Sequence, residues 1–267
     1  MEITKNPKPK FSIAIQSDAI KKMIMNTLGN QKDAQQFVAN ITSAVSSNYL
    51  LQSCEVGSII SAGLTANSLK LPIQQSLGFA YIVPYGNKAQ FQIGYKGLIQ
   101  LALRSGQYEK IGVKAVHEGE IKGLDEFGDL EIKFDLTKQT NPIVGYYAYF
   151  KLMNGSKQTL YMSNEECEAH GKKYSKAYNN LWAKNFDVMA KKTVLKLLLS
   201  RYGIMSVEIQ NALQYDQAVI HKDSDKDILE YVDNPMASKT VEVPTTNNEE
   251  GEVEESETLD TSIEETL

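Results

Sequence analysis

The chain has 267 residues, of which 42% are hydrophobic and 23% charged, so it can bury a core as one large domain or two small ones. Its longest apolar run ends at Arg201 and is interrupted by Lys196, well short of the roughly 20 apolar residues that a membrane-spanning helix needs. The N-terminus lacks the apolar run of a secretory signal, and two cysteines make no disulfide framework. A membrane protein is therefore excluded, and we expect a protein of a reducing cytoplasm.

The net charge of −5 combines two regions of opposite sign. Residues 222–267 hold 15 Asp or Glu against three Lys, a net charge of −12, which leaves residues 1–221 with +7. Most of the positive charge lies between His170 and Arg201, where seven lysines and one arginine accompany a single acid, Asp187. This concentration predicts a polyanionic partner.

The N-terminal third is predicted to be helical. Three lysines and two prolines in the first ten residues indicate a mobile basic arm. Apolar residues at helical spacing predict helices over about 20–28 and 37–48. A third helix is predicted from about Ser53 to Gly63.

The middle of the chain has the pattern of strands. Residues 78–94 form two aromatic and β-branched runs about Gly86-Asn87, which predicts a β-hairpin. A helix follows over 95–105, and alternating apolar residues then predict further strands, which we list as 111–115, 130–134, 144–153 and 158–162. We expect one mostly antiparallel sheet of about five or six strands.

Helices return in the C-terminal third. Ser163 and Glu166 fit a capping box for a helix that reaches about Lys172, and a long basic helix is predicted over 178–202. Ser206 fits the N-cap of a last helix, and apolar periodicity disappears beyond His221. The predicted fold class is α+β, with a core over 30–221 and an acidic, largely disordered tail over 222–267.

Few motifs of enzymatic chemistry are present. The chain has no phosphate-binding loop with its Gly-Lys-Ser/Thr end, which argues against an ATP-driven recombinase. The three histidines, His117, His170 and His221, share no spacing typical of zinc ligands. An acidic cluster suggests a cation site, although a solvated loop is the preferred interpretation; its members are Asp125, Glu126, Asp129 and Glu131. We therefore expect no enzyme, no metal and no cofactor.

Three features fit either DNA binding or ordinary structure. Gly94 and Gly97 begin a helix, where their backbone N–H groups would favour an anion, or they make a tight strand-to-helix turn. Lysines of the basic helix either bind a polyanion or only form a solvent-exposed face of the helix. Few acids in this part of the sequence could pair with them, and this favours binding. The 14 tyrosines suit stacking on bases, but also packing in strands, which is favoured.

Four segments in this order resemble the RecT family of phage single-strand annealing proteins. They are residues 77–86, 90–106, 144–148 and 186–195. The resemblance spans residues 52–213 and leaves the N-terminal arm and the acidic tail unmatched. It implies an ATP-independent protein of the bacterial host cytoplasm that coats single-stranded DNA and anneals a complementary strand during phage recombination.

The resemblance also implies a set of partners and site residues. Similar proteins form rings and helical filaments, and we expect residues 1–29, the arm and the first helix, to make the oligomer contacts. The resemblance further implies that the core over 30–221 binds and anneals DNA. The partners implied are single-stranded DNA, newly annealed duplex, further copies of the chain, a host single-strand binding protein and a phage exonuclease. Backbone contacts are assigned to Lys96, Arg104, Lys184, Lys191 and Lys192, with Tyr95 as a stacking residue. The alternatives are a simple single-stranded DNA-binding protein without annealing activity and, less favoured, a metal-dependent nuclease that uses Asp125, Asp129 and Glu131.

Overall fold

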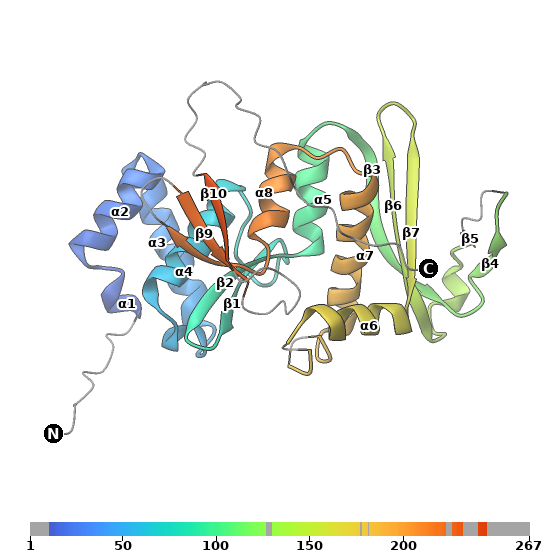
Figure 1. Cartoon of the computed structure of the whole chain (residues 1–267), viewed down its shortest axis with the longest axis horizontal. Coiled ribbons are helices and arrows are strands. Elements are labelled where there is room, and N and C mark those ends of the chain that lie inside the picture. The colour runs from blue at the N-terminus through green and yellow to red at the C-terminus, as the bar shows by residue number, and fades with distance from the viewer. Residues whose placement is uncertain are drawn as a thin grey trace.

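The computed structural model describes residues 11–126, 130–176, 178–180, 182–222, 226–231 and 240–244. It has the predicted α+β class, with helices and antiparallel strands. Figure 1 shows an elongated molecule with helices α1 to α3 at one end and strands β4 and β5 at the other. The predicted mobile arm, residues 1–10, lies outside the described residues.

The N-terminal helices are α1 (Phe11–Ala14), α2 (Asp18–Leu28), α3 (Gln31–Ser46) and, after the 3-10 turn η1 (Leu51–Ser53), α4 (Val56–Ser68). The prediction for α2 is confirmed, and Gly29 ends it in the left-handed conformation at φ +76°. The predicted end of α4 at Gly63 is wrong, because Gly63 lies inside the helix. A Cβ there would approach Ile41 Cδ1 to 2.6 Å, so this glycine permits close packing of α4 on α3.

The predicted β-hairpin is confirmed as β1 (Ala80–Tyr85) and β2 (Lys88–Ile93), followed by α5 (Tyr95–Arg104). The larger sheet has the order β3-β6-β7, from β3 (Tyr108–His117), β6 (Ile143–Leu152) and β7 (Lys157–Ser163). A separate hairpin joins β4 (Ile121–Leu124) to β5 (Leu130–Ile132), and a 3-10 turn, η2 (Leu136–Lys138), follows.

The expectation of one sheet of five or six strands is wrong. The strands of the described residues divide among four small sheets. The reason lies in the helices, because α5 and α7 pack on the β3-β6-β7 sheet while α4 packs on β1, β2 and β8. In Figure 1, α5 and α7 stand between the larger sheet and the rest of the molecule, so the strands cannot join across them.

Helix α6 (Asn164–Tyr174) has the predicted capping box, in which Ser163 Oγ accepts from Glu166 N at 3.2 Å and the Glu166 carboxylate accepts from Ser163 N at 2.7 Å. The predicted start of the next helix at 178 is wrong, since α7 spans Phe186–Tyr202. Trp182 lies before it, buried against Gly171, where a Cβ would come within 2.7 Å of the indole. This packing holds the chain in turns ahead of the helix.

The C-terminal part of the described chain begins with α8 (Val207–Tyr215), capped by Ser206 as predicted. Strands β8 (Val219–Lys222), β9 (Lys226–Glu230) and β10 (Thr240–Pro244) then form an antiparallel sheet. The prediction of a largely disordered tail from residue 222 is therefore wrong for β9 and β10. Acidic neighbours concealed the alternating pattern that buries Leu229 completely. Residues 245–267 of the predicted tail lie outside the described residues.

The two last strands are expected to belong to the stable fold. A chain that ends at residue 221 loses the buried Leu229 and the ion pair between Lys88 and Glu230 at 2.7 Å. We expect it to be less stable than the full chain by at least about 2–5 kcal/mol, the usual cost of deleting one buried leucine side chain. A chain that ends at residue 244 keeps both strands and serves as the control. Urea unfolding measures both, and equal midpoints for the two truncations would contradict this assignment.

Candidate nucleic-acid interface

A groove of about 880 Å³ runs between the β1–β2 hairpin and the first turns of α7 with the segment before it. The hairpin forms one wall. Tyr81 pairs with Gln92 and Val83 with Gln90 across the two strands, so these side chains share one face of the hairpin. Together with Tyr95 they line the groove, and this wall is uncharged.

The opposite wall carries the positive charge. Lys176, Lys184 and Lys192 line it, with the amides of Asn180 and Asn185. None of the described residues that line the groove is Asp or Glu. Lys184 is exposed, and within the described part of the chain it has no carboxylate within 4.0 Å. A groove with a neutral aromatic wall and a basic wall suits a single strand, which offers bases on one side and phosphates on the other.

The Tyr81 hydroxyl of the groove stays neutral at physiological pH. Burial first, and then the neighbouring Tyr95, raise the pKa of the Tyr81 hydroxyl above its ordinary value. A neutral phenol ring does not repel phosphate, and it offers a flat surface on which a base of any identity can stack. Tyr81 lies on a strand, β1, as the packing prediction expects for tyrosines, and it also lines the groove.

Lys192 is fixed by a buried ion pair. Its side chain is almost completely buried, and its Nζ lies 2.7 Å from Asp216 Oδ1, while Lys196 Nζ lies 3.1 Å from Oδ2. Asp216 Oδ1 also accepts from the backbone N of Ile93 at 3.1 Å. Burial would raise the pKa of Asp216, but the two lysines outweigh it and hold that pKa below its ordinary value.

The expectation that acids opposing the basic helix are nearly absent is therefore wrong in part. Asp216 lies 24 residues from Lys192 in sequence and pairs with it only through the fold. Lys191 pairs with Asp187 at 2.7 Å, one helical turn away, and it does not line the groove.

The groove thus brings together three of the six predicted site residues, Tyr95, Lys184 and Lys192. Lys96 is exposed at the start of α5, beyond the residues that line the groove. Arg104 lies at the other end of α5, about 12 Å along the helix, and donates to the carbonyl of Leu69 at 2.9 Å.

The glycines at the start of α5 have a packing role. A Cβ on Gly94 would lie 2.2 Å from the carbonyl O of Gly78, and one on Gly97 would lie 2.2 Å from that of Phe79. Only glycine permits this approach of the helix start to the chain before β1. The geometry favours the tight-turn alternative over an anion site.

Sequence reasoning missed Gln90 and Gln92, which line the groove from β2 and are almost completely buried. Their alternation with Phe91 gave a signal, because a polar residue at every second position of a strand marks one face. The sequence alone did not show that this face is covered.

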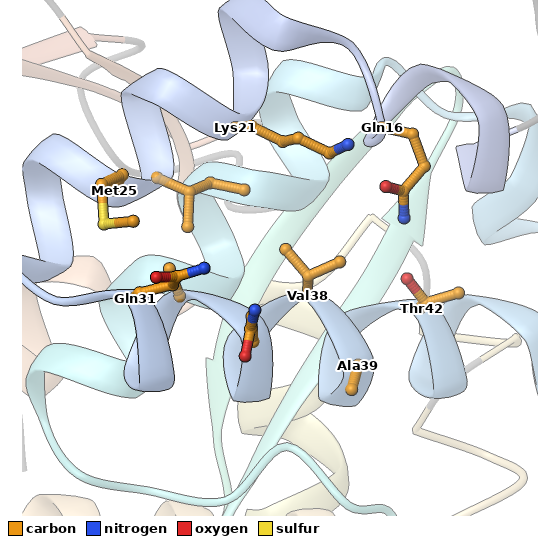
Figure 2. A pocket seen from close by; sticks show the side chains of 10 residues that line it. Gln16, Lys21, Met25, Gln31, Val38, Ala39 and Thr42 are labelled. Carbon is orange, nitrogen blue, oxygen red and sulfur yellow. The ribbon is translucent and has the colours of Figure 1, made fainter.

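A second groove lies between α2 and α3 and encloses about 670 Å³. Figure 2 shows Val38 and Thr42 of α3 directed toward α2, with Lys21 across the gap. Lys21 is the single charged residue among the described residues that line it. Thr42 Oγ1 is buried there, and no group in the described part of the chain hydrogen-bonds to it. This surface is mostly apolar and lies in the region predicted to make oligomer contacts.

The residues considered for metal binding lie apart. Within the described ranges, no three His, Cys, Asp or Glu side chains are placed to share a metal ion. His117 Nδ1 contacts Asn141 O at 2.7 Å, and burial lowers the pKa of His170 to about 4, with further lowering by Lys196 and Lys173. Asp129 of the acidic cluster lies outside the described residues. In the same ranges no helix is both long and apolar enough to span a bilayer.

Comparison with known proteins gives matches over most of the chain. The model of the family described as "RecT family" matches residues 35–230. The chain is 41% identical over 239 residues to "Uncharacterized protein YqaK" of Bacillus subtilis (strain 168), covering 89% of this chain and 81% of that protein. It is 32% identical over 215 residues to "Protein RecT" of Escherichia coli (strain K12), covering 76% of this chain and 78% of that protein.

Replacing the buried carboxylate is expected to destabilise the protein. In Asp216→Asn the amide oxygen still accepts from Ile93, but Lys192 and Lys196 lose their anion, at a cost of about 3–5 kcal/mol. Glu109→Gln is the control, since the pair of Glu109 with Lys151 is exposed and worth about 0–1 kcal/mol. Urea unfolding at neutral pH measures both.

The ion pair of Asp216 also predicts how the loss of stability in Asp216→Asn depends on pH. Because the folded protein lowers the pKa of Asp216, the pair contributes fully above the unfolded value near 3.8 and is lost as the pH falls through the lower folded value. The stability gap between the wild type and Asp216→Asn should therefore be constant near neutral pH and narrow in acid. A gap that is absent at neutral pH would show that the pair contributes nothing.

Proposed function

Because the chain belongs to the RecT family, a family of single-strand annealing proteins of recombination, we propose that it binds single-stranded DNA and anneals complementary strands in phage recombination without ATP. The observation that carries the proposal is the groove between β1–β2 and α7, with its tyrosines on one wall and its lysines on the other. This arrangement holds a strand without reading its sequence, which is what annealing of arbitrary sequences requires.

The two walls have separate tasks in this proposal. Lys184 and Lys176 contact phosphates, which lowers the repulsion between two strands. Tyr81 and Tyr95 provide rings on which bases stack. Lys192, held by Asp216, adds positive potential from a fixed position, while Lys96, Lys191 and Arg104 are proposed to contact backbone beyond the groove.

The protein is proposed to act as an oligomer, in rings or helical filaments along the strand. The contacts are assigned to residues 1–29, which include α2. The apolar groove between α2 and α3, with its unpartnered Thr42 hydroxyl, supports a second copy as the occupant of this surface. Head-to-tail contacts of this kind generate rings or filaments because they use two different surfaces of each copy.

The remaining partners are assigned to the acidic C-terminus. Residues 245–267 contain nine Asp or Glu and no Lys or Arg. We propose that they dock on a host single-strand binding protein or a phage exonuclease in the bacterial cytoplasm. Ile228 and Leu229 do not belong to this docking segment, since both lie on β9 and Leu229 is in the core.

The two alternative functions differ from annealing in the activity that each would show. A simple single-stranded DNA-binding protein would sequester strands and block their pairing. A metal-dependent nuclease would degrade labelled DNA in the presence of magnesium. A fluorescence annealing assay with and without magnesium distinguishes the three activities.

Lys184 is expected to contact one phosphate. Lys184→Ala should reduce the steepness of log K against log salt by about 0.7 and weaken single-strand binding roughly fivefold at about 0.1 M salt. Lys157→Ala is the control, because Lys157 is exposed at the start of β7 and does not line the groove. An unchanged slope for Lys184→Ala would show that this wall does not touch the phosphates.

The order of strand addition is expected to matter. A groove built for one strand gains from a second only if pairing happens within it, since preformed B-DNA must first deform at a cost of order 1–6 kcal/mol. Complexes made by adding complementary strands one after the other, without nucleotide triphosphate, should therefore resist salt better than complexes made on duplex. Equal salt resistance would favour a simple binding protein.

A further inference from the structure

Two neutral amides lie on the hairpin wall of the groove. Gln90 and Gln92 are 1% and 4% exposed, and both side chains line the cavity from β2. Val83 and Tyr81 face them across the hairpin. Both side chains are therefore almost completely buried by the protein around them, although they line the groove.

These amides have hydrogen-bonding capacity that the protein leaves unused. Gln90 Oε1 is buried and has no hydrogen-bond partner among the residues that the structure describes. The Gln92 amide has only a weak contact, from Nε2 to the thioether sulfur of Met189 at 3.9 Å. A buried polar group without a partner destabilises the fold, because it has lost its hydrogen bonds to water. Asp216 nearby shows the contrast, since both its oxygens are used.

The chemistry of the vacant acceptor restricts its ligand. Gln90 Oε1 needs a donor, and the phosphates and sugars within a DNA strand offer only acceptors. The donors of single-stranded DNA are the N–H groups of its bases. Each of the four bases carries at least one N–H donor and one acceptor on its pairing edge, so an amide, which has both, can bond any of them.

We propose that Gln90 and Gln92 form a base-accepting subsite, in which they hydrogen-bond the pairing edge of one unpaired base of the bound strand. The inference rests on the proposed function, because it assumes that the groove holds single-stranded DNA. The rings of Tyr81 and Tyr95 line the same groove and provide stacking surfaces for that base. The subsite tolerates any sequence, and it discriminates against a paired base, whose edge is occupied.

The subsite also has a consequence for annealing. The base that it holds leaves the amides when a complementary strand pairs with it. The amides therefore strengthen binding of the single strand and contribute nothing to binding of the annealed product.

The first test uses the unaltered protein and modified DNA. An oligonucleotide of N3-methylthymidine keeps the ring for stacking and every phosphate, but it lacks the N–H donor of thymidine. We expect it to bind roughly fivefold more weakly per engaged base than the thymidine oligonucleotide, the value of one neutral hydrogen bond. The slope of affinity against salt should be the same for both. Equal affinities would overturn the subsite.

The second test uses the protein variant Gln90→Met, Gln92→Met, in which side chains of similar length lack the amide. It should bind a thymidine oligonucleotide at least fivefold more weakly, and an abasic oligonucleotide of equal length as the wild type does. Gln100→Met is the matched control, since Gln100 is exposed on α5 and does not line the groove. Equal weakening with the abasic oligonucleotide would instead assign the amides to the DNA backbone and overturn the proposal.

The stability of the double variant without DNA distinguishes a structural role of the amides from a ligand-binding role. If they serve a ligand, their replacement by methionine removes an unsatisfied buried group, and the urea midpoint without DNA should be equal or higher. A clear fall would show that they support the fold and would count against the subsite. Failure of the proposed function is separate, since it would appear as no binding of the unmodified oligonucleotide by the wild type.

Discussion

The carboxylate of Asp216 connects three parts of the chain that form the groove. It accepts from the end of β2 through Ile93 N, binds two lysines of α7, and sits at the link from α8 to β8. A buried carboxylate is costly unless it is paired and hydrogen-bonded, and here both oxygens have partners. The hairpin wall and the helix wall are therefore held relative to each other by one side chain.

The same interaction gives the groove part of its electrostatic character. Two lysines meet one carboxylate, so the cluster keeps an excess of one positive charge beside the groove. Lys192 is fixed there by burial, and it loses no side-chain freedom when a polyanion binds. The exposed Lys184 provides a mobile charge on the same wall, which adapts to the position of a phosphate.

Local signals in the sequence predicted much of the fold but little of the site. The β1–β2 hairpin, α5 and the capping box of α6 follow from turns, periodicity and caps within a few residues. The pairing of Lys192 with Asp216 spans 24 residues, and the partition of the strands into four sheets depends on where α5 and α7 pack. Such long-range contacts leave no periodic trace. Gln90 and Gln92 appeared as ordinary strand residues for the same reason.

The unequal walls define how a strand would lie in the groove. All the lysines of the lining belong to α7 and the segment before it, whereas the hairpin contributes aromatic, aliphatic and amide side chains. Phosphates would follow the helix wall and bases would face the hairpin, because each wall satisfies one part of a nucleotide. A strand held in this way has its charge neutralised from one side only. In the proposed function, a complementary base can replace the contacts that hold a base in the groove, which is what annealing requires.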